Sequence, residues 1–110
     1  MARKLGVTIL LKGPVDVISN GMSVKFNFTG NPGMTVGGTG DVLSGVVGGL
    51  LAMGVDSFGS AVAGAFINGA AGDFVAVEKG HHMIPTDILE WIPHVMDDPM
   101  CHLEVRRSTT

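Results

Sequence analysis

The first thirty residues alternate between short apolar runs and turn formers. Residues 7–11 form an apolar, β-branched run that a Lys-Gly-Pro sequence ends, and residues 15–19 form a second run. Asn20-Gly21 is a dipeptide typical of tight hairpin turns, and it leads into residues 24–28, where apolar and polar side chains alternate. The pattern therefore predicts one buried strand followed by a β-hairpin.

Helical spacing replaces this pattern in the second part of the chain. Apolar residues recur three and four positions apart from 42 to 51, and Gly54 is the predicted stop of this helix. A second helix is predicted from near Ser57 to Lys79. Its interior holds three glycines, each lowering helix propensity by up to ~1 kcal/mol relative to alanine. We therefore expect this helix to pack closely against its neighbours at Gly64, Gly69 and Gly72.

A third helix is predicted to open at Pro85. Thr86 is a suitable N-cap, and Pro93 predicts a break or kink further along. Residues 99–110 show no clear pattern and are expected to form a disordered tail. The predicted organisation is thus one partial domain over residues 1–98 and a tail over residues 99–110.

Composition narrows the function classes. Apolar residues make up 45% and charged residues 15% of the 110 residues, which is typical of a small folded domain. The net charge is −3 without a basic stripe, so we expect no nucleic-acid partner. The longest weakly polar run, residues 42–55, is shorter than the ~20 residues that span a bilayer, so no membrane partner is expected. A single cysteine fits a reducing cytoplasm, and the adjacent pair His81-His82 lacks the companions of a metal site, so none is expected.

A glycine-rich loop is the most informative local feature. Its core reads Gly37-Gly38-Thr39-Gly40-Asp41 and directly precedes the first predicted helix. Glycines let the backbone approach a ligand, and the helix start offers free N–H groups, which together suit a phosphate. The spacing matches neither a Walker A loop nor the Gly-x-Gly-x-x-Gly fingerprint.

Several polar residues near this loop each have two possible roles. Asp41 is either a helix-capping residue or a general base for a substrate hydroxyl. Lys12 either reaches a phosphate or faces solvent at a strand end, and Asn31 either forms a turn or sets the loop geometry beneath a nucleotide. Asn68 and Asp73 lie in an apolar helix and need partners, so they either face the site or bridge to loops.

Longer strings carry a family resemblance. Residues 11–18 (Leu-Lys-Gly-Pro-Val-Asp-Val-Ile) and 30–45 (Gly-Asn-Pro-Gly-Met-Thr-Val-Gly-Gly-Thr-Gly-Asp-Val-Leu-Ser-Gly) resemble the NAD(P)H-hydrate dehydratases. Residues 63–73 and 85–89 continue the match, which covers roughly residues 5–97. The Gly-Thr-Gly-Asp element alone indicates only the ribokinase-like superfamily, whereas the longer string around it is much more specific.

The resemblance implies an α/β fold, namely the C-terminal part of a ribokinase-like α/β sandwich with short strands, a hairpin and about three helices. Members use ADP or ATP to dehydrate the hydrate of NADH or NADPH, by phosphorylation of its hydroxyl and elimination. Asp41 matches the aspartate that touches the hydrated substrate, and magnesium is expected with the phosphates. The nucleotide-binding residues are then Lys12, Gly13, Pro14, Val15, Asp16 and Gly40, with Asn31, Gly37, Gly38 and Thr39 in the adjoining loop.

Two rival interpretations stay open. One is a ribokinase-like kinase for a sugar or vitamin precursor, and the other is a truncated remnant without catalytic activity. The chain matches only the C-terminal portion of the family, so open strand edges and apolar surface are expected to favour a homo-oligomer. The choice between ADP and ATP and the presence of a fused epimerase stay open as well.

Overall fold

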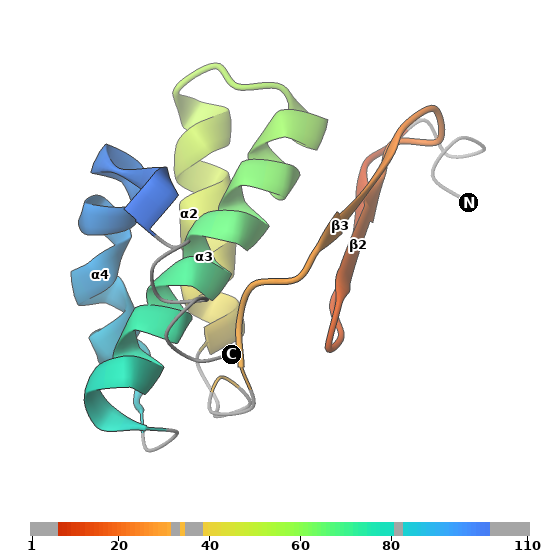
Figure 1. Cartoon of the computed structure of the whole chain (residues 1–110). Helices are drawn as coiled ribbons and strands as arrows, with labels where there is room; N and C mark the ends of the chain where they lie inside the picture. The colour runs from red at the N-terminus through yellow and green to blue at the C-terminus, as the bar shows by residue number, and fades with distance from the viewer. Residues whose placement is uncertain (1–6, 32–33, 35–38, 81–82, 102–110) are drawn as a thin grey trace.

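A three-stranded antiparallel sheet lies beside three helices (Figure 1). The structure, a computed structural model, describes residues 7–31, 34, 39–80 and 83–101. In chain order the elements are β1 (Ile9–Leu11), β2 (Asp16–Ser19), β3 (Val24–Asn27), α2 (Thr39–Ala52), α3 (Ser57–Lys79), α4 (Pro85–Asp97) and the short 3-10 turn η2 (Pro99–Cys101). This confirms the predicted α/β class.

The sheet is a meander in the order β1-β2-β3. Val17 of β2 lies opposite Leu11 of β1 on one side and opposite Phe26 of β3 on the other. The turn between β2 and β3 contains Gly21 at a φ of 89°, a left-handed conformation that glycine adopts without strain. The Asn20 side chain closes this turn by accepting hydrogen bonds from the backbone N–H groups of residues 22 and 23. The predicted hairpin is therefore confirmed.

The two faces of the sheet differ in burial. Ile18 on the inner face is fully buried against Ala61 and Ala65 of α3. Because directly opposed residues of antiparallel strands share a face, Leu11, Val17 and Phe26 lie together on the other side. We call this the outer sheet face, and its strongly exposed apolar residues are Leu11, Val24 and Phe26.

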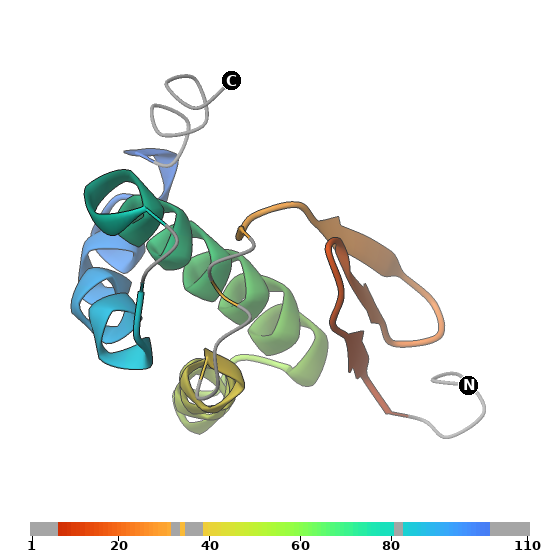
Figure 2. The same ribbon diagram turned by 90° about the horizontal axis from the view of Figure 1, so that it is seen from below.

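Helix α3 is the centre of the molecule, with the sheet on one side and α4 on the other (Figures 1 and 2). A main core cluster joins the three helices, and its fully buried members include Ala70, Ala71, Val75, Ile88 and Val95. Two thirds of the most apolar window of α3 is buried. By length and composition α3 could span a membrane, but such burial is also found in the core helices of soluble proteins.

The three glycines of α3 sit at close approaches, as predicted. A Cβ at Gly64 would collide with Val47 of α2, one at Gly69 would collide with Thr29, and one at Gly72 would collide with the Met34 side chain. Each glycine therefore admits a different neighbour, which explains why a helix this rich in glycine forms.

Helix ends follow the sequence signals only in part. Gly54 and Gly80 follow α2 and α3 with φ of 95° and 65°, as expected for helix stops. The predicted N-cap Thr86 is wrong, because α4 begins at Pro85 and its N-cap is Ile84. Of the break or kink predicted at Pro93, the break does not occur, since α4 continues to Asp97; burial of its apolar face against α3 offsets the hydrogen bond that proline cannot donate.

Asp87 fastens the start of α4. Its carboxylate accepts hydrogen bonds from the Ile84 backbone N–H at 2.9 Å and from Lys79 Nζ at 2.7 Å. The backbone hydrogen bond from Ile84 and then the Lys79 ammonium lower the pKa of Asp87. The same contact raises the pKa of Lys79, and the pair links the last turn of α3 to the first turn of α4.

Candidate functional site

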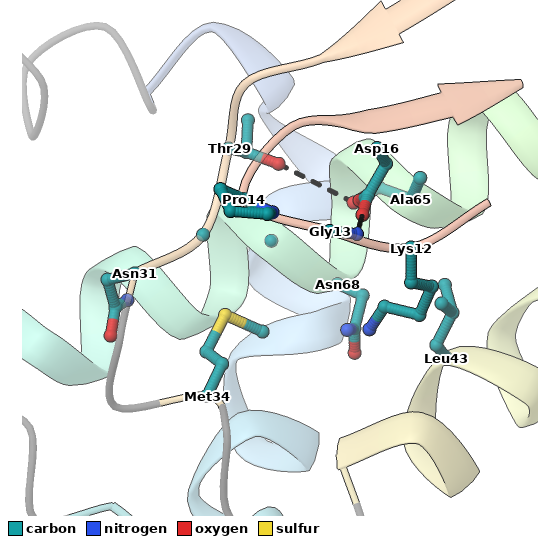
Figure 3. A pocket seen from close by; sticks show the side chains of 12 residues that line it. Lys12, Gly13, Pro14, Asp16, Thr29, Asn31, Met34, Leu43, Ala65 and Asn68 are labelled. Carbon is teal, nitrogen blue, oxygen red and sulfur yellow. Dashed lines mark hydrogen bonds between the residues drawn. The ribbon is translucent and has the colours of Figure 1, made fainter.

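A cavity of about 710 Å³ lies where the sheet meets α2 and α3 (Figure 3). Three stretches of chain build most of its wall: the turn after β1, the segment after β3, and the middle of α3. Its lining residues are Lys12, Gly13, Pro14, Asp16, Thr29, Gly30, Asn31, Met34, Leu43, Ala65, Asn68 and Gly69. The wall mixes apolar side chains with polar groups, as in many small-molecule sites.

The structure brings many of the sequence-predicted binding residues to this cavity. Five of them line it, namely Lys12, Gly13, Pro14, Asp16 and Asn31. In Figure 3 the Lys12 side chain extends from the end of β1 past Leu43, which belongs to the beginning of α2, and its nitrogen ends beside Asn68 of α3. Val15, in the same segment, is half-buried and is not part of the lining.

The glycine loop is only partly described. Gly37 and Gly38 lie outside the described residues, and Thr39 begins α2. Helix α2 thus starts three residues earlier than predicted, so Gly40 and Asp41 lie in its first turn, both exposed. Neither is among the described lining residues, and the role of Asp41 stays a prediction.

Asp16 shapes the turn that carries Lys12. Its carboxylate is nearly buried and accepts hydrogen bonds from the Gly13 backbone N–H at 3.3 Å and from Asn27 Nδ2 at 3.0 Å. Asn27 Nδ2 also donates to the Ala65 carbonyl of α3, and Asn27 Oδ1 accepts from Thr29 Oγ1. Buried polar groups that are satisfied in this way hold one geometry. The network therefore fixes the turn against both β3 and α3.

Asp73 fixes the other wall. Gly30 has a φ of 104°, and its backbone N–H donates to Asp73 Oδ2 at 3.1 Å. Asn31 Nδ2 donates to Asp73 Oδ1, also at 3.1 Å. Of the two readings left open for Asp73, bridging to a loop is the one observed. Asn31 lines the cavity while its amide anchors the segment after β3 to α3.

Sequence reasoning missed part of the wall. Of the two interpretations left open for Asn68, facing the site is the one observed, since this residue lines the cavity. A polar residue in an apolar helix is a signal that the sequence itself offers. The apolar lining residues carry no such signal, because in the sequence they look like ordinary core positions. The lining residues without a predicted role are Thr29, Gly30, Met34, Leu43, Ala65 and Gly69.

Comparison with known proteins decides the family. The family model described as NAD(P)H-hydrate dehydratase matches residues 1–94. The chain belongs to this family. Among curated relatives, the bifunctional NAD(P)H-hydrate repair enzyme Nnr of Methanocaldococcus jannaschii is 53% identical over 89 residues, covering 81% of this chain and 18% of the relative. The ADP-dependent (S)-NAD(P)H-hydrate dehydratase of Cenarchaeum symbiosum is 50% identical over 96 residues, which cover 87% of this chain and 33% of the relative.

A solved structure supports the fold. Bacillus subtilis YxkO, a member of the UPF0031 family, matches with a TM-score of 0.77 and 27% identity over 87% of this chain and 37% of the other. The chain therefore spans between about a fifth and about two fifths of the length of these three relatives. The predicted family membership and the predicted fold are both confirmed.

Proposed function

We propose that the cavity binds a nucleoside diphosphate or triphosphate and that this chain carries the nucleotide-binding part of an NAD(P)H-hydrate dehydratase. The observation that carries the proposal is the cavity itself, which collects Lys12, Gly13 and Asn31 from segments about twenty residues apart. Relatives from Cenarchaeum symbiosum and Nitrosopumilus maritimus are named ADP-dependent dehydratases, which favours ADP over ATP.

The polar groups of the site suit phosphates. Lys12, an exposed lining residue, supplies a positive charge, and the first turn of α2 supplies backbone N–H groups with the positive end of the helix dipole. Phosphoryl transfer depends mainly on such positioning and charge neutralisation. In the proposed arrangement the phosphates lie between Lys12 and the first turn of α2, with NAD(P)H hydrate as the acceptor.

Asp41 is the proposed general base. It would take the proton from the hydroxyl of the hydrated ring as that oxygen receives the phosphoryl group, and phosphate would then leave in the elimination step. Its exposed position in the first turn of α2 leaves the carboxylate accessible to a substrate entering from solvent. A carboxylate at this end of a helix is also electrostatically favourable.

Magnesium is proposed to accompany the nucleotide. Within the described part of the chain no group of three or more histidine, cysteine, aspartate or glutamate side chains could hold a metal ion. Mg²⁺ commonly binds through substrate phosphates and one or two carboxylates and keeps several waters. A phosphate-borne ion therefore fits these residues better than a dedicated protein site, and it would neutralise phosphate charge.

Calorimetry with ADP and with ATP, each with Mg²⁺, tests the binding step. We expect saturable binding that Lys12→Ala weakens about 10- to 100-fold, because a charge-assisted hydrogen bond contributes roughly 1.5–3 kcal/mol. Lys25→Ala, at an exposed lysine on β3 outside the cavity wall, is the matched control. If a folded chain binds neither nucleotide, nucleotide binding by this polypeptide is excluded and the remnant interpretation is favoured.

Product analysis tests the reaction. With hydrated NADH and ADP, a dehydratase releases NADH, whereas a small-molecule kinase accumulates a phosphorylated product. Asp41→Asn should lower the rate about 10²- to 10⁴-fold while nucleotide binding persists, as expected for loss of a general base. Asp97→Asn, at an exposed aspartate on α4, should leave the rate unchanged. An Asp41→Asn variant with the normal rate would contradict the assigned base.

A further inference from the structure

Asp73 is a buried carboxylate to which the proposed reaction gives no role. It lies in α3, and only 6% of its surface is exposed. It is absent from the described lining of the cavity in which the nucleotide is proposed to bind. A buried carboxylate is unfavourable unless hydrogen-bond donors satisfy it. The donors that Asp73 accepts from therefore indicate what this residue contributes.

The chain that leaves β3 lies along α3 beside Asp73. Gly69 leaves room for Thr29, and Gly72 leaves room for the Met34 side chain. Four residues of this stretch line the cavity, and we call them the cavity segment: Thr29, Gly30, Asn31 and Met34. They are four of the twelve lining residues, so their position determines the shape of one wall.

Asp73 holds the cavity segment at two consecutive residues. One carboxylate oxygen accepts from the Gly30 backbone N–H, and the other accepts from Asn31 Nδ2, each at 3.1 Å. Gly30 has a φ of 104°, a conformation that residues other than glycine rarely adopt. Hydrogen bonds to an ionised acceptor are roughly twice as strong as neutral ones. Asp73 therefore anchors a wall of the cavity from outside the cavity.

We propose that Asp73 is a positioning residue of the nucleotide site. Its two hydrogen bonds hold the cavity segment in the arrangement that binds the nucleotide, so affinity depends on the geometry of the carboxylate and not on its charge. A negative charge acting directly on the ligand would repel phosphates, which argues against a direct role. This inference rests on the proposed nucleotide binding and adds a residue that acts without touching the ligand.

Calorimetric titration with ADP and Mg²⁺ tests the proposal. Asp73→Ala should bind ADP about tenfold more weakly than the wild-type chain. Loss of a hydrogen bond to a charged group changes a local equilibrium by about that factor. Apparent affinity falls in proportion to the population of the binding-competent arrangement.

Two substitutions separate geometry from charge. Asp73→Asn removes the charge, yet the new carboxamide can accept from the Gly30 N–H and donate to Asn31 once the Asn31 carboxamide rotates. We therefore expect it to restore ADP affinity to within about twofold of wild type. Asp73→Glu keeps the charge, but its extra methylene displaces the closely packed cavity segment. It should weaken ADP binding about as much as Asp73→Ala.

A destabilised control separates positioning from loss of stability. Val95→Ala truncates a fully buried residue of α4 that lies outside the described lining. It should lower the free energy of unfolding, measured by chemical denaturation, while ADP affinity stays within about twofold of wild type. If Val95→Ala loses ADP affinity in step with its stability, as Asp73→Ala does, stability alone explains both losses and the positioning role is overturned.

The outcomes distinguish this inference from the proposed function. A folded wild-type chain that does not bind ADP would overturn nucleotide binding, and the positioning role with it. ADP binding by wild type that Asp73→Ala leaves unchanged would overturn the positioning role alone. If Asp73→Ala does not fold, judged by circular dichroism, the asparagine and glutamate variants decide. Normal affinity in Asp73→Asn with a loss in Asp73→Glu supports positioning, and any other pattern overturns it.

Discussion

The sheet and the helical layer differ in how much of their apolar surface they bury. The helices enclose a core of their own, in which Val75, Ile88 and Val95 are fully buried. The sheet buries one face only, through Ile18, against two alanines of α3. Its outer face leaves Phe26 60% exposed; an antiparallel sheet can leave one face to water, but a contiguous apolar patch on that face is typical of an interaction site.

The cavity therefore has one wall from the extensively buried helical layer and one from the sheet layer, which buries fewer apolar side chains. Helix α3 contributes Asn68 and Gly69 from the well-packed layer, whereas Lys12 and Gly13 come from a turn in the sheet layer. Two networks, centred on Asp16 and Asp73, connect the walls. Polar contacts therefore add to the small Ile18 cluster in holding the sheet layer against α3, whereas the helical layer relies on apolar burial.

Matched isoleucine substitutions should separate the layers most clearly. Ile88→Ala removes a fully buried side chain from the helical core and should lower the free energy of unfolding by about 2–5 kcal/mol, toward the upper end. The loss in free energy of unfolding for Ile18→Ala should lie toward the lower end of that range, because the smaller cluster around Ile18 relaxes more easily.

Hydrogen exchange distinguishes a local from a global effect. Ile18→Ala should speed exchange of the amides in β1–β3 and leave those of α4 nearly unchanged, as expected for a separate opening unit. Equal acceleration in the strands and in α4 would instead show that the two layers unfold together.

The α3 glycines offer a second, smaller contrast. A Cβ at Gly69 would meet Thr29 close to its backbone, so Gly69→Ala should lower the free energy of unfolding by about 1–3 kcal/mol. A Cβ at Gly72 would meet only flexible side-chain atoms of Met34. Gly72→Ala should therefore stay within about 1 kcal/mol of wild type, since alanine's better helix propensity offsets the shift. Chemical denaturation of both variants checks the ranking, and equal losses would contradict it.

The outer sheet face should govern self-association. Phe26→Ser should reduce oligomer formation measured by sedimentation while changing the free energy of unfolding by only about 0.5 kcal/mol. Leu89→Ser, at an exposed apolar residue of α4, serves as the matched control and should leave association unchanged. A wild-type chain that stays monomeric at high concentration would remove the basis for a homo-oligomer.

The ion pair at the start of α4 should give the smallest effect. The pKa of Asp87 is lowered in the folded chain, so its contribution is present above the unfolded pKa and is lost as pH falls through the folded value. Asp87→Asn should thus melt slightly below wild type at neutral pH, and the gap should close below the ordinary carboxyl pKa of 3.8. A gap that persists in strong acid would show that the loss is not electrostatic.

Local patterns in the sequence were sufficient for much of the fold. Conformational preferences of single residues account for three such features. These are the turn at Asn20-Gly21, the helix ends at Gly54 and Gly80, and the close approaches of the α3 glycines. Thr86 is not the N-cap because the Asp87 carboxylate caps the backbone at Ile84, one turn earlier, and Pro93 does not end α4 because burial of the helix outweighs the hydrogen bond lost at proline.

The site was harder to predict because its wall is assembled across the sequence. Lys12 and Asn31 could be named from motifs, whereas Leu43 and Ala65 look like ordinary core residues until the fold brings them to a cavity. The roles of Asp16 and Asp73 as anchors depend on partners more than ten residues away, which no local pattern reveals.

One aromatic contact gives the molecule an internal optical reporter. Trp91, the sole tryptophan of the chain, stacks on Phe74 with ring centroids 4.6 Å apart, and His94 meets both rings edge-on. This cluster joins α3 to α4, on the opposite side of α3 from the sheet. Indole emission therefore reads the packing of one side of the central helix, while the cavity lies on the other side, so it reports the fold of the helical layer separately from the proposed nucleotide site.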